Sequence, residues 1–123
     1  MAIKISGTTI IDDSRNLTGA IIDDLKETVF TISDGVSVEL NPTNGPIQVW
    51  TLGADRTPTT NFDSGASMTL MVDDGTARII NWGSASITWV GGSAPSLATT
   101  GYTVLEFWKV SSTIYGALVG EVA

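Results

Sequence analysis

The chain has 123 residues, no cysteine, no histidine and a formal net charge of −7. Without cysteine and histidine there is no disulfide framework and no thiolate or imidazole for nucleophilic catalysis, general-base catalysis or metal binding, so we expect neither an enzyme nor a cofactor. An acidic surface repels phosphate backbones, and no apolar run approaches the roughly 20 residues of a membrane-spanning helix, so we expect no nucleic-acid or membrane partner.

Residues 1–27 predict an extended arm and linker. Isoleucines alternate with polar residues on both sides of a turn at Ser6-Gly7, which is strand periodicity. The segment 21–27 is too short to form a stable helix unaided, so it is interpreted as a linker. An arm of this kind can add a strand to a partner's sheet, and the alternative is that it folds onto its own domain or frays. The candidate assembly residues in the arm are Ile3, Ile5, Ile10, Ile11, Arg15 and Leu17.

Residues 28–123 predict one all-β head domain. Short stretches of alternating hydrophobicity, separated by turn residues, recur through this region. The expected strands are 28–32, 36–40, 47–52, 68–72, 77–82, 86–90, 103–110 and 113–119. The first two would form a hairpin at Asp34-Gly35, and the last two a hairpin at Ser111-Ser112. We therefore expect an antiparallel β-sandwich of the jelly-roll type with about eight strands.

Clustered acidic residues are the only other candidates for chemistry. The pairs are Asp12-Asp13, Asp23-Asp24 and Asp73-Asp74. Neighbouring residues on a strand point to opposite faces, so such pairs do not converge on one bond as the two carboxylates of a glycosidase must. Asp73-Asp74-Gly75 is explained by a turn, and no calcium-loop spacing is present. The sequence therefore predicts no catalytic, cofactor or metal site.

Aromatic side chains are candidates for a non-catalytic binding site or subunit contact. If exposed, they can stack on sugar rings or lie at a seam between subunits, and if buried they fill the core. The candidates for a subunit seam or a glycan site are Trp50, Trp82, Trp108 and Tyr115. The sequence leaves both interpretations open for these four.

Two stretches of the chain resemble virion proteins of tailed phages. Residues 89–100 (WVGGSAPSLATT), 101–108 (GYTVLEFW) and 114–120 (IYGALVG) resemble the carboxy-terminal β-domain of such proteins, in which a Trp, a Gly-Gly-x-x-Pro loop, a Thr run, an alternating strand and a Tyr-Gly hairpin follow in this order. Residues 5–17 (ISGTTIIDDSRNL) are similar to segments of phage fibre proteins. No catalytic residue accompanies these motifs.

The resemblance implies a homotrimer with a β-sandwich or tulip-like head attached to a virion. The short acidic chain is similar to capsid decoration, or cement, proteins, which lie on the outer capsid surface and bind the major capsid protein. The arm would then grip the shell or a sister subunit. One alternative is a location on the tail, as a short tail fibre or receptor-binding head that contacts tail proteins and host glycans. Another is a free carbohydrate-binding module.

Overall fold

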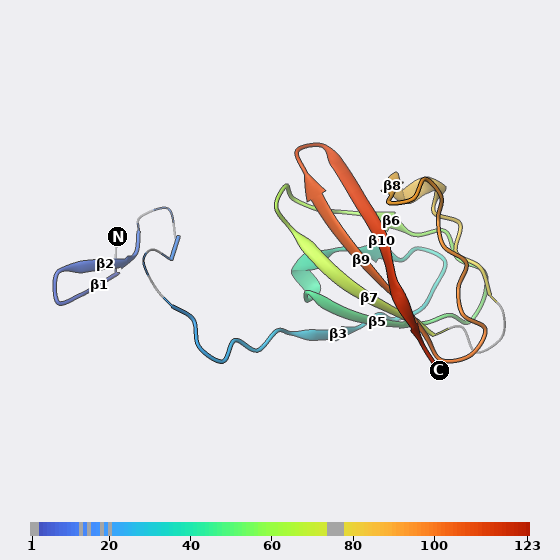
Figure 1. Cartoon of the computed structure of the whole chain (residues 1–123), viewed down its shortest axis with the longest axis horizontal. Helices are drawn as coiled ribbons and strands as arrows, with labels where there is room; N and C mark the ends of the chain where they lie inside the picture. Colours follow the sequence, from blue (N-terminus) through green and yellow to red (C-terminus); the bar gives the residue numbers. More distant parts are fainter. Residues whose placement is uncertain (1–2, 13, 15, 18, 20, 74–77) are drawn as a thin grey trace.

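The computed structural model describes residues 3–12, 14, 16, 17, 19, 21–73 and 78–123. Strands dominate this part of the chain, which contains no α-helix (Figure 1). Its only helical turns are two short 3-10 turns, η1 (Pro42–Asn44) and η2 (Gly83–Ala85). The all-β class predicted from the sequence is confirmed for the described residues.

A six-stranded sheet forms the centre of the head, in the order β3-β5-β7-β9-β10-β8. Its strands are β3 (Val29–Thr31), β5 (Ile47–Thr51), β7 (Ser67–Asp73), β8 (Ile87–Trp89), β9 (Tyr102–Val110) and β10 (Thr113–Val122). β9 pairs antiparallel with β7 and with β10, whereas β3-β5, β5-β7 and β8-β10 are parallel. The expectation of a purely antiparallel arrangement is therefore wrong. Alternating hydrophobicity marks a strand but not its direction, which here depends on long crossover segments.

The predicted hairpin at Asp34-Gly35 is also wrong. β3 pairs with β5, while β4 (Glu39–Leu40) pairs in parallel with β6 (Thr59–Thr60) in a separate small sheet. The side chain of Asp34 accepts hydrogen bonds from residues 50–56. These long-range bonds direct the chain away from β3 after residue 34.

The carboxy-terminal hairpin follows the prediction. β9 and β10 pair from Thr113↔Val110 to Val122↔Tyr102 across the connection Ser111-Ser112, with a bulge between Leu118 and Gly120. Ser111 has a φ of 56°, a left-handed conformation that two-residue hairpin loops require. The hairpin places the longest strands of the sheet side by side.

The core lies on one face of the sheet. Alternate residues of β5, β7 and β9 point to it, and the β4-β6 sheet, η2 and the adjoining loops cover it. Its largest fully buried apolar side chains are Trp50, Phe107, Leu40, Met68, Leu70 and Leu105. The predicted strand 77–82 begins at a residue outside the described part of the chain, and Ile80 makes an isolated parallel bridge with Arg56.

Near the amino terminus the chain forms a hairpin. β1 (Ile3–Ile5) pairs antiparallel with β2 (Thr8–Ile11) across Ser6 and Gly7, whose φ angles are 51° and 78°. Two successive positive φ values produce a tight turn at the position predicted from the sequence, and the two strands bond to each other across it. The extended arm over residues 1–27 stays a prediction. Figure 1 shows this hairpin clear of the sheet, joined to β3 by an irregular segment.

Candidate assembly surfaces

The second face of the six-stranded sheet carries an apolar surface that no described segment buries. We call this surface the open face. Because β5, β7 and β9 alternate between buried and half-buried residues, the half-buried set points away from the core. The apolar and aromatic members at the centre of the open face are Ile47, Val49, Met71, Val104, Trp108, Tyr115 and Ala117.

Strand register arranges the open face in rows. Val49, Met71 and Val104 lie directly beside one another across β5, β7 and β9 and form an apolar row. Trp108 and Tyr115 are paired across β9 and β10, and their rings stack with centroids 5.9 Å apart and an interplanar angle of 20°. An apolar row and an aromatic pair thus lie on the same side of the sheet.

A polar row lies between the apolar row and the aromatic pair. Thr69 lies beside Glu106, and its hydroxyl donates a hydrogen bond of 2.6 Å to the Glu106 carboxylate. Among the described residues of this face there is no lysine or arginine to pair with that carboxylate. The open face is therefore mainly apolar, with the Glu106 carboxylate near its centre and Asp73 at the end of β7.

The four aromatic candidates from the sequence occupy two different environments. Trp50 is fully buried, and its Nε1 donates to Asp34 Oδ1 at 2.8 Å. Trp82 is buried against Trp89, with ring centroids 5.3 Å apart in an edge-to-face arrangement. The structure thus places Trp50 and Trp82 in the core, whereas Trp108 and Tyr115 are half-buried on the open face.

The candidate arm residues lie in and beside the amino-terminal hairpin. Ile3 belongs to β1 and Ile10 to β2, while Ile5 is 66% exposed. Ile11 is half-buried and forms an isolated bridge with Leu17, which is 47% exposed. Arg15 lies outside the described residues. Exposed aliphatic side chains are thus present at Ile5 in the hairpin and at Leu17 beside it.

Asp12 organises the turn that follows β2. Its Oδ1 accepts hydrogen bonds of 2.9 Å from the backbone N–H groups of Ser14 and Asn16. These bonds, foremost that from Asn16, hold the pKa of Asp12 below its ordinary value. Asp12 therefore has a turn-forming role.

Asp34 ties three segments of the head together. Besides Trp50, its carboxylate accepts from the Gly53 backbone N–H at 2.9 Å and from the Arg56 guanidinium in a two-pronged ion pair. The hydrogen bonds from Arg56 are the main reason that the pKa of Asp34 is lowered to about 2. The backbone of Arg56 in turn bonds to Ile79 and Asn81. The cluster therefore fixes the segment 78–82.

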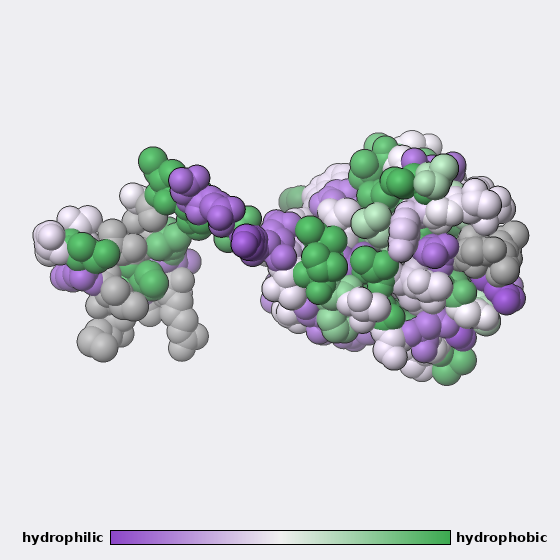
Figure 2. All heavy atoms as spheres, turned by 90° about the horizontal axis from the view of Figure 1, so that it is seen from below, coloured by the Kyte–Doolittle hydropathy of each residue, from purple (hydrophilic) through white to green (hydrophobic). Residues whose placement is uncertain are grey.

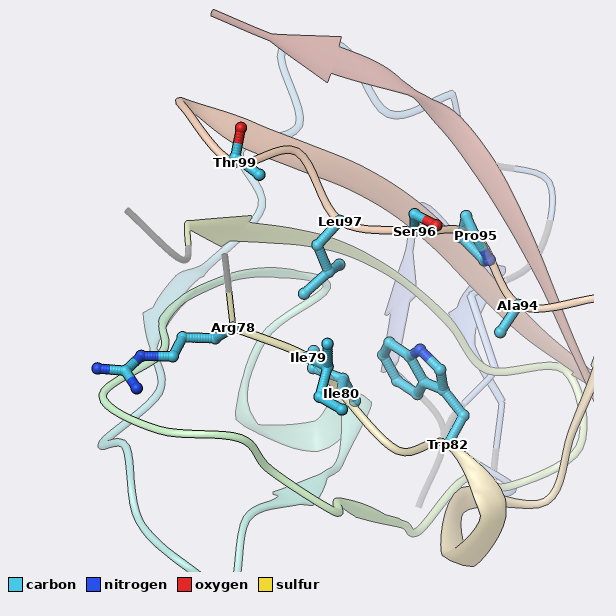
Figure 3. A pocket seen from close by; sticks show the side chains of 9 residues that line it. All are labelled: Arg78, Ile79, Ile80, Trp82, Ala94, Pro95, Ser96, Leu97 and Thr99. Atoms are coloured by element: carbon cyan, nitrogen blue, oxygen red, sulfur yellow. The ribbon is translucent and has the colours of Figure 1, made fainter. Parts of the chain in front are cut away.

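A groove lies between that segment and the loop 94–99. Its volume is about 370 Å³, and Ile80, Trp82 and Leu97 line it (Figure 3). The sequence does not indicate this groove, because the two segments that form it are separated by β8 and contain no recognisable motif.

The described residues contain no cluster of three or more acidic side chains that could hold a metal ion. Within the same part of the chain, no helix is long and apolar enough to cross a membrane. Comparisons with models of known protein families, with curated protein sequences and with solved structures found no significant match in any of the three. The open face, the hairpin and the groove are the structural features of the described residues that bear on function.

Proposed function

We propose that this chain is a non-enzymatic structural protein of a tailed-phage virion, a trimeric capsid decoration protein that binds the major capsid protein and stabilises the shell. The observation that carries the proposal is the open face. Such a face is a candidate contact surface, because the largest contiguous apolar patch of a monomer, typically roughly 300–600 Å², is often the site of an interaction. We propose that this face binds a sister subunit.

The size of the open face supports an assembly in which it acts together with a second contact. Four strands about 4.8 Å apart and about seven residues long, at 3.4 Å per residue, span on the order of 500 Å². A stable interface of standard size buries about 800 Å² on each partner. The face alone falls short of that area, so we propose that the amino-terminal hairpin and linker supply the remainder.

The proposal includes a sandwich-like head of the jelly-roll or tulip type. Leu40 of β4 and Ala85 of η2 are both fully buried, which supports treating the small β4-β6 sheet and its flanking turns as a second layer over the core. Under this proposal the amino-terminal residues project from the head as an arm. The open face then forms the inner wall where three heads meet.

Light scattering on the full chain tests the trimer. We expect the mass of a trimer for the native protein and of a monomer for Met71→Lys, because the new charge would be buried in the seam. Val36→Lys is the matched control, since Val36 is 85% exposed and lies off the sheet. Unchanged circular dichroism would show that both variants fold. A monomeric native protein would contradict the proposed trimer.

Immunogold electron microscopy of virions that carry the protein tests its location. We expect label over the capsid. Label confined to tails would contradict the capsid assignment and favour a tail protein.

A receptor-binding head at the tail is the second candidate, and the Trp108–Tyr115 stack favours it. Aromatic rings that are open to solvent bind the apolar faces of sugars. If this candidate is correct, Trp108→Ala reduces binding of the labelled protein to host cells while its mass stays that of the native oligomer. A loss of the oligomer would instead assign Trp108 to the seam.

A further inference from the structure

The groove between residues 78–82 and 94–99 has the dimensions of a binding site. Its volume of about 370 Å³ falls within the range of roughly 300–1,000 Å³ typical of ligand pockets. Ile80 and Trp82 on one side and Leu97 on the other make it mainly apolar, and Figure 3 shows their side chains facing a common space. An aliphatic side chain is the kind of group that such a surface accepts.

Arg78 places a positive charge at one end of the groove. Its side chain lines the groove, and in Figure 3 the guanidinium points away from Leu97 and Trp82. Arg78 Nε is buried and has no hydrogen-bond partner among the residues that the structure describes. The terminal nitrogens of the same guanidinium can bind a carboxylate, the acceptor that forms the strongest hydrogen bonds with arginine.

The linker 21–27 has the complementary character. Ile21 is 97%, Ile22 57% and Leu25 69% exposed. Asp23 and Asp24 stand among these aliphatic residues, so each carboxylate has an apolar neighbour within one or two positions. Figure 2 shows the same alternation of hydrophobic and hydrophilic atoms along the linker. Such exposed aliphatic residues gain free energy when a partner covers them.

The positions of the linker and the groove indicate that the partner is a second copy. The linker leaves the head at β3, which is an edge strand of the sheet. Along the long axis of the molecule, Figure 1 places that edge at the opposite end of the head from the segments around 78–82 and 94–99. The linker 21–27 therefore points away from the groove of its own head.

We infer that the linker 21–27 of one copy docks in the groove of the next copy. Its aliphatic side chains pack on Ile80 and Leu97, and a carboxylate of Asp23 or Asp24 pairs with Arg78. The inference rests on the proposed trimeric assembly and identifies its second contact. A contact between two different surfaces repeats head to tail, and with a rotation of one third of a turn it closes as a ring of three.

Disulfide trapping tests this contact, because the native chain contains no cysteine. We expect Ile22→Cys combined with Leu97→Cys to give covalent dimers and trimers on non-reducing denaturing gels after mild oxidation. Ile22→Cys combined with Val36→Cys is the matched control and should remain a single chain. A ladder of equal strength in both variants, or a cross-link only within one chain, would overturn the inference.

Charge reversal provides a second readout in the full chain. Arg78→Glu should weaken trimer association on the order of tenfold, which corresponds to about 1.4 kcal/mol. Adding Asp23→Arg and Asp24→Arg to this variant should restore association, since every copy then carries both reversed partners. If the triple variant associates no better than Arg78→Glu alone, the pairing of the linker carboxylates with Arg78 is overturned.

Light scattering separates failure of the docking from failure of the proposed function. A native trimer that shows no specific cross-link would overturn the docking of the linker and leave the trimer intact. A native monomer would overturn both.

Discussion

Asp34 combines several favourable interactions in one carboxylate. Trp50, Gly53 and Arg56 all donate to it, and its side chain is only 20% exposed. Hydrogen bonds to a charged group each contribute roughly 1.5–3 kcal/mol, more than bonds between neutral groups. Because Arg56 also bonds to the segment 78–82 through its backbone, the carboxylate stabilises one wall of the groove from a distance.

Asp34→Asn should therefore lower the free energy of unfolding at pH 7 by about 1–3 kcal/mol. In the native protein the pKa of Asp34 is about 2, below the ordinary value of 3.8, so the unfolded chain takes up the proton more readily. The stabilisation is complete above about pH 4 and is lost as the pH falls toward 2. Thermal unfolding followed by circular dichroism at several pH values between about 2 and 7 measures this loss of stability.

The stability of Asp34→Asn should depend less on pH in this range than that of the native protein. The difference in Tm between the two therefore narrows as the pH is lowered. Asp63→Asn, at an exposed position, is the control and should leave the Tm at pH 7 nearly unchanged. An equal Tm for native protein and Asp34→Asn at pH 7 would contradict the role of the cluster.

Individual residues also show where prediction from the sequence stops. All four aromatic candidates lie in similar alternating patterns, yet Trp50 and Trp82 are in the core and Trp108 and Tyr115 are on the open face. Alternation assigns neighbours to opposite faces of a strand but does not tell which face the rest of the chain covers. That information comes from the crossover segments, which carry no periodic signal.

At the scale of elements, the β9-β10 hairpin could be predicted because every determinant is local. Both strands alternate, and they are joined by two small polar residues. The predicted 28–32/36–40 hairpin failed for the opposite reason, since Asp34-Gly35 is a good turn sequence but Asp34 is bonded to residues far along the chain. The groove likewise depends on long-range contacts and has no local signature.

Gly116 in β10 packs closely against β8 and β9. A Cβ there would lie 2.8 Å from Ile87 Cγ2, 2.9 Å from Trp89 Cζ3 and 3.0 Å from Phe107 Cε1. Gly116→Ala should therefore destabilise the protein by about 1–3 kcal/mol, as overpacked cores do. Urea unfolding followed by tryptophan fluorescence measures the change, because the tryptophans in and against the core become exposed on unfolding.

Gly120→Ala is the control in the same strand, since a Cβ at that position meets no atom within 4 Å. It should leave stability unchanged or raise it slightly, because alanine reduces the conformational entropy of the unfolded chain. Equal destabilisation by both substitutions would show that strand propensity, and not packing at Gly116, sets the effect.

At the scale of the whole molecule, the open face combines apolar side chains with one central carboxylate. If the open faces of several copies meet in a seam, the Glu106 carboxylate of each subunit lies in the same apolar interior. The Thr69 hydroxyl then donates a hydrogen bond to it. Burying like charges together opposes association. The carboxylate therefore limits how tightly the proposed trimer holds together.

Glu106→Gln should tighten association on the order of tenfold, because it removes the charge and keeps an oxygen that accepts from Thr69. Sedimentation equilibrium measures the association constant. Glu121→Gln, which removes the same charge from an exposed site, is the control and should change association little. Unchanged association of Glu106→Gln would place the carboxylate outside the seam, and weaker association would show that its charge stabilises the contact.

The amino-terminal hairpin has a kinetic consequence for such an assembly. Because β1 and β2 already satisfy each other's inner backbone groups, a partner meets a preformed edge and no strand has to be exchanged. Association of preorganised surfaces avoids the entropic cost of ordering a free segment. Its rate is set by encounter and orientation, and differences in affinity appear mainly in the dissociation rate. In the proposed assembly, subunits joined through this hairpin can dissociate and associate again without unfolding.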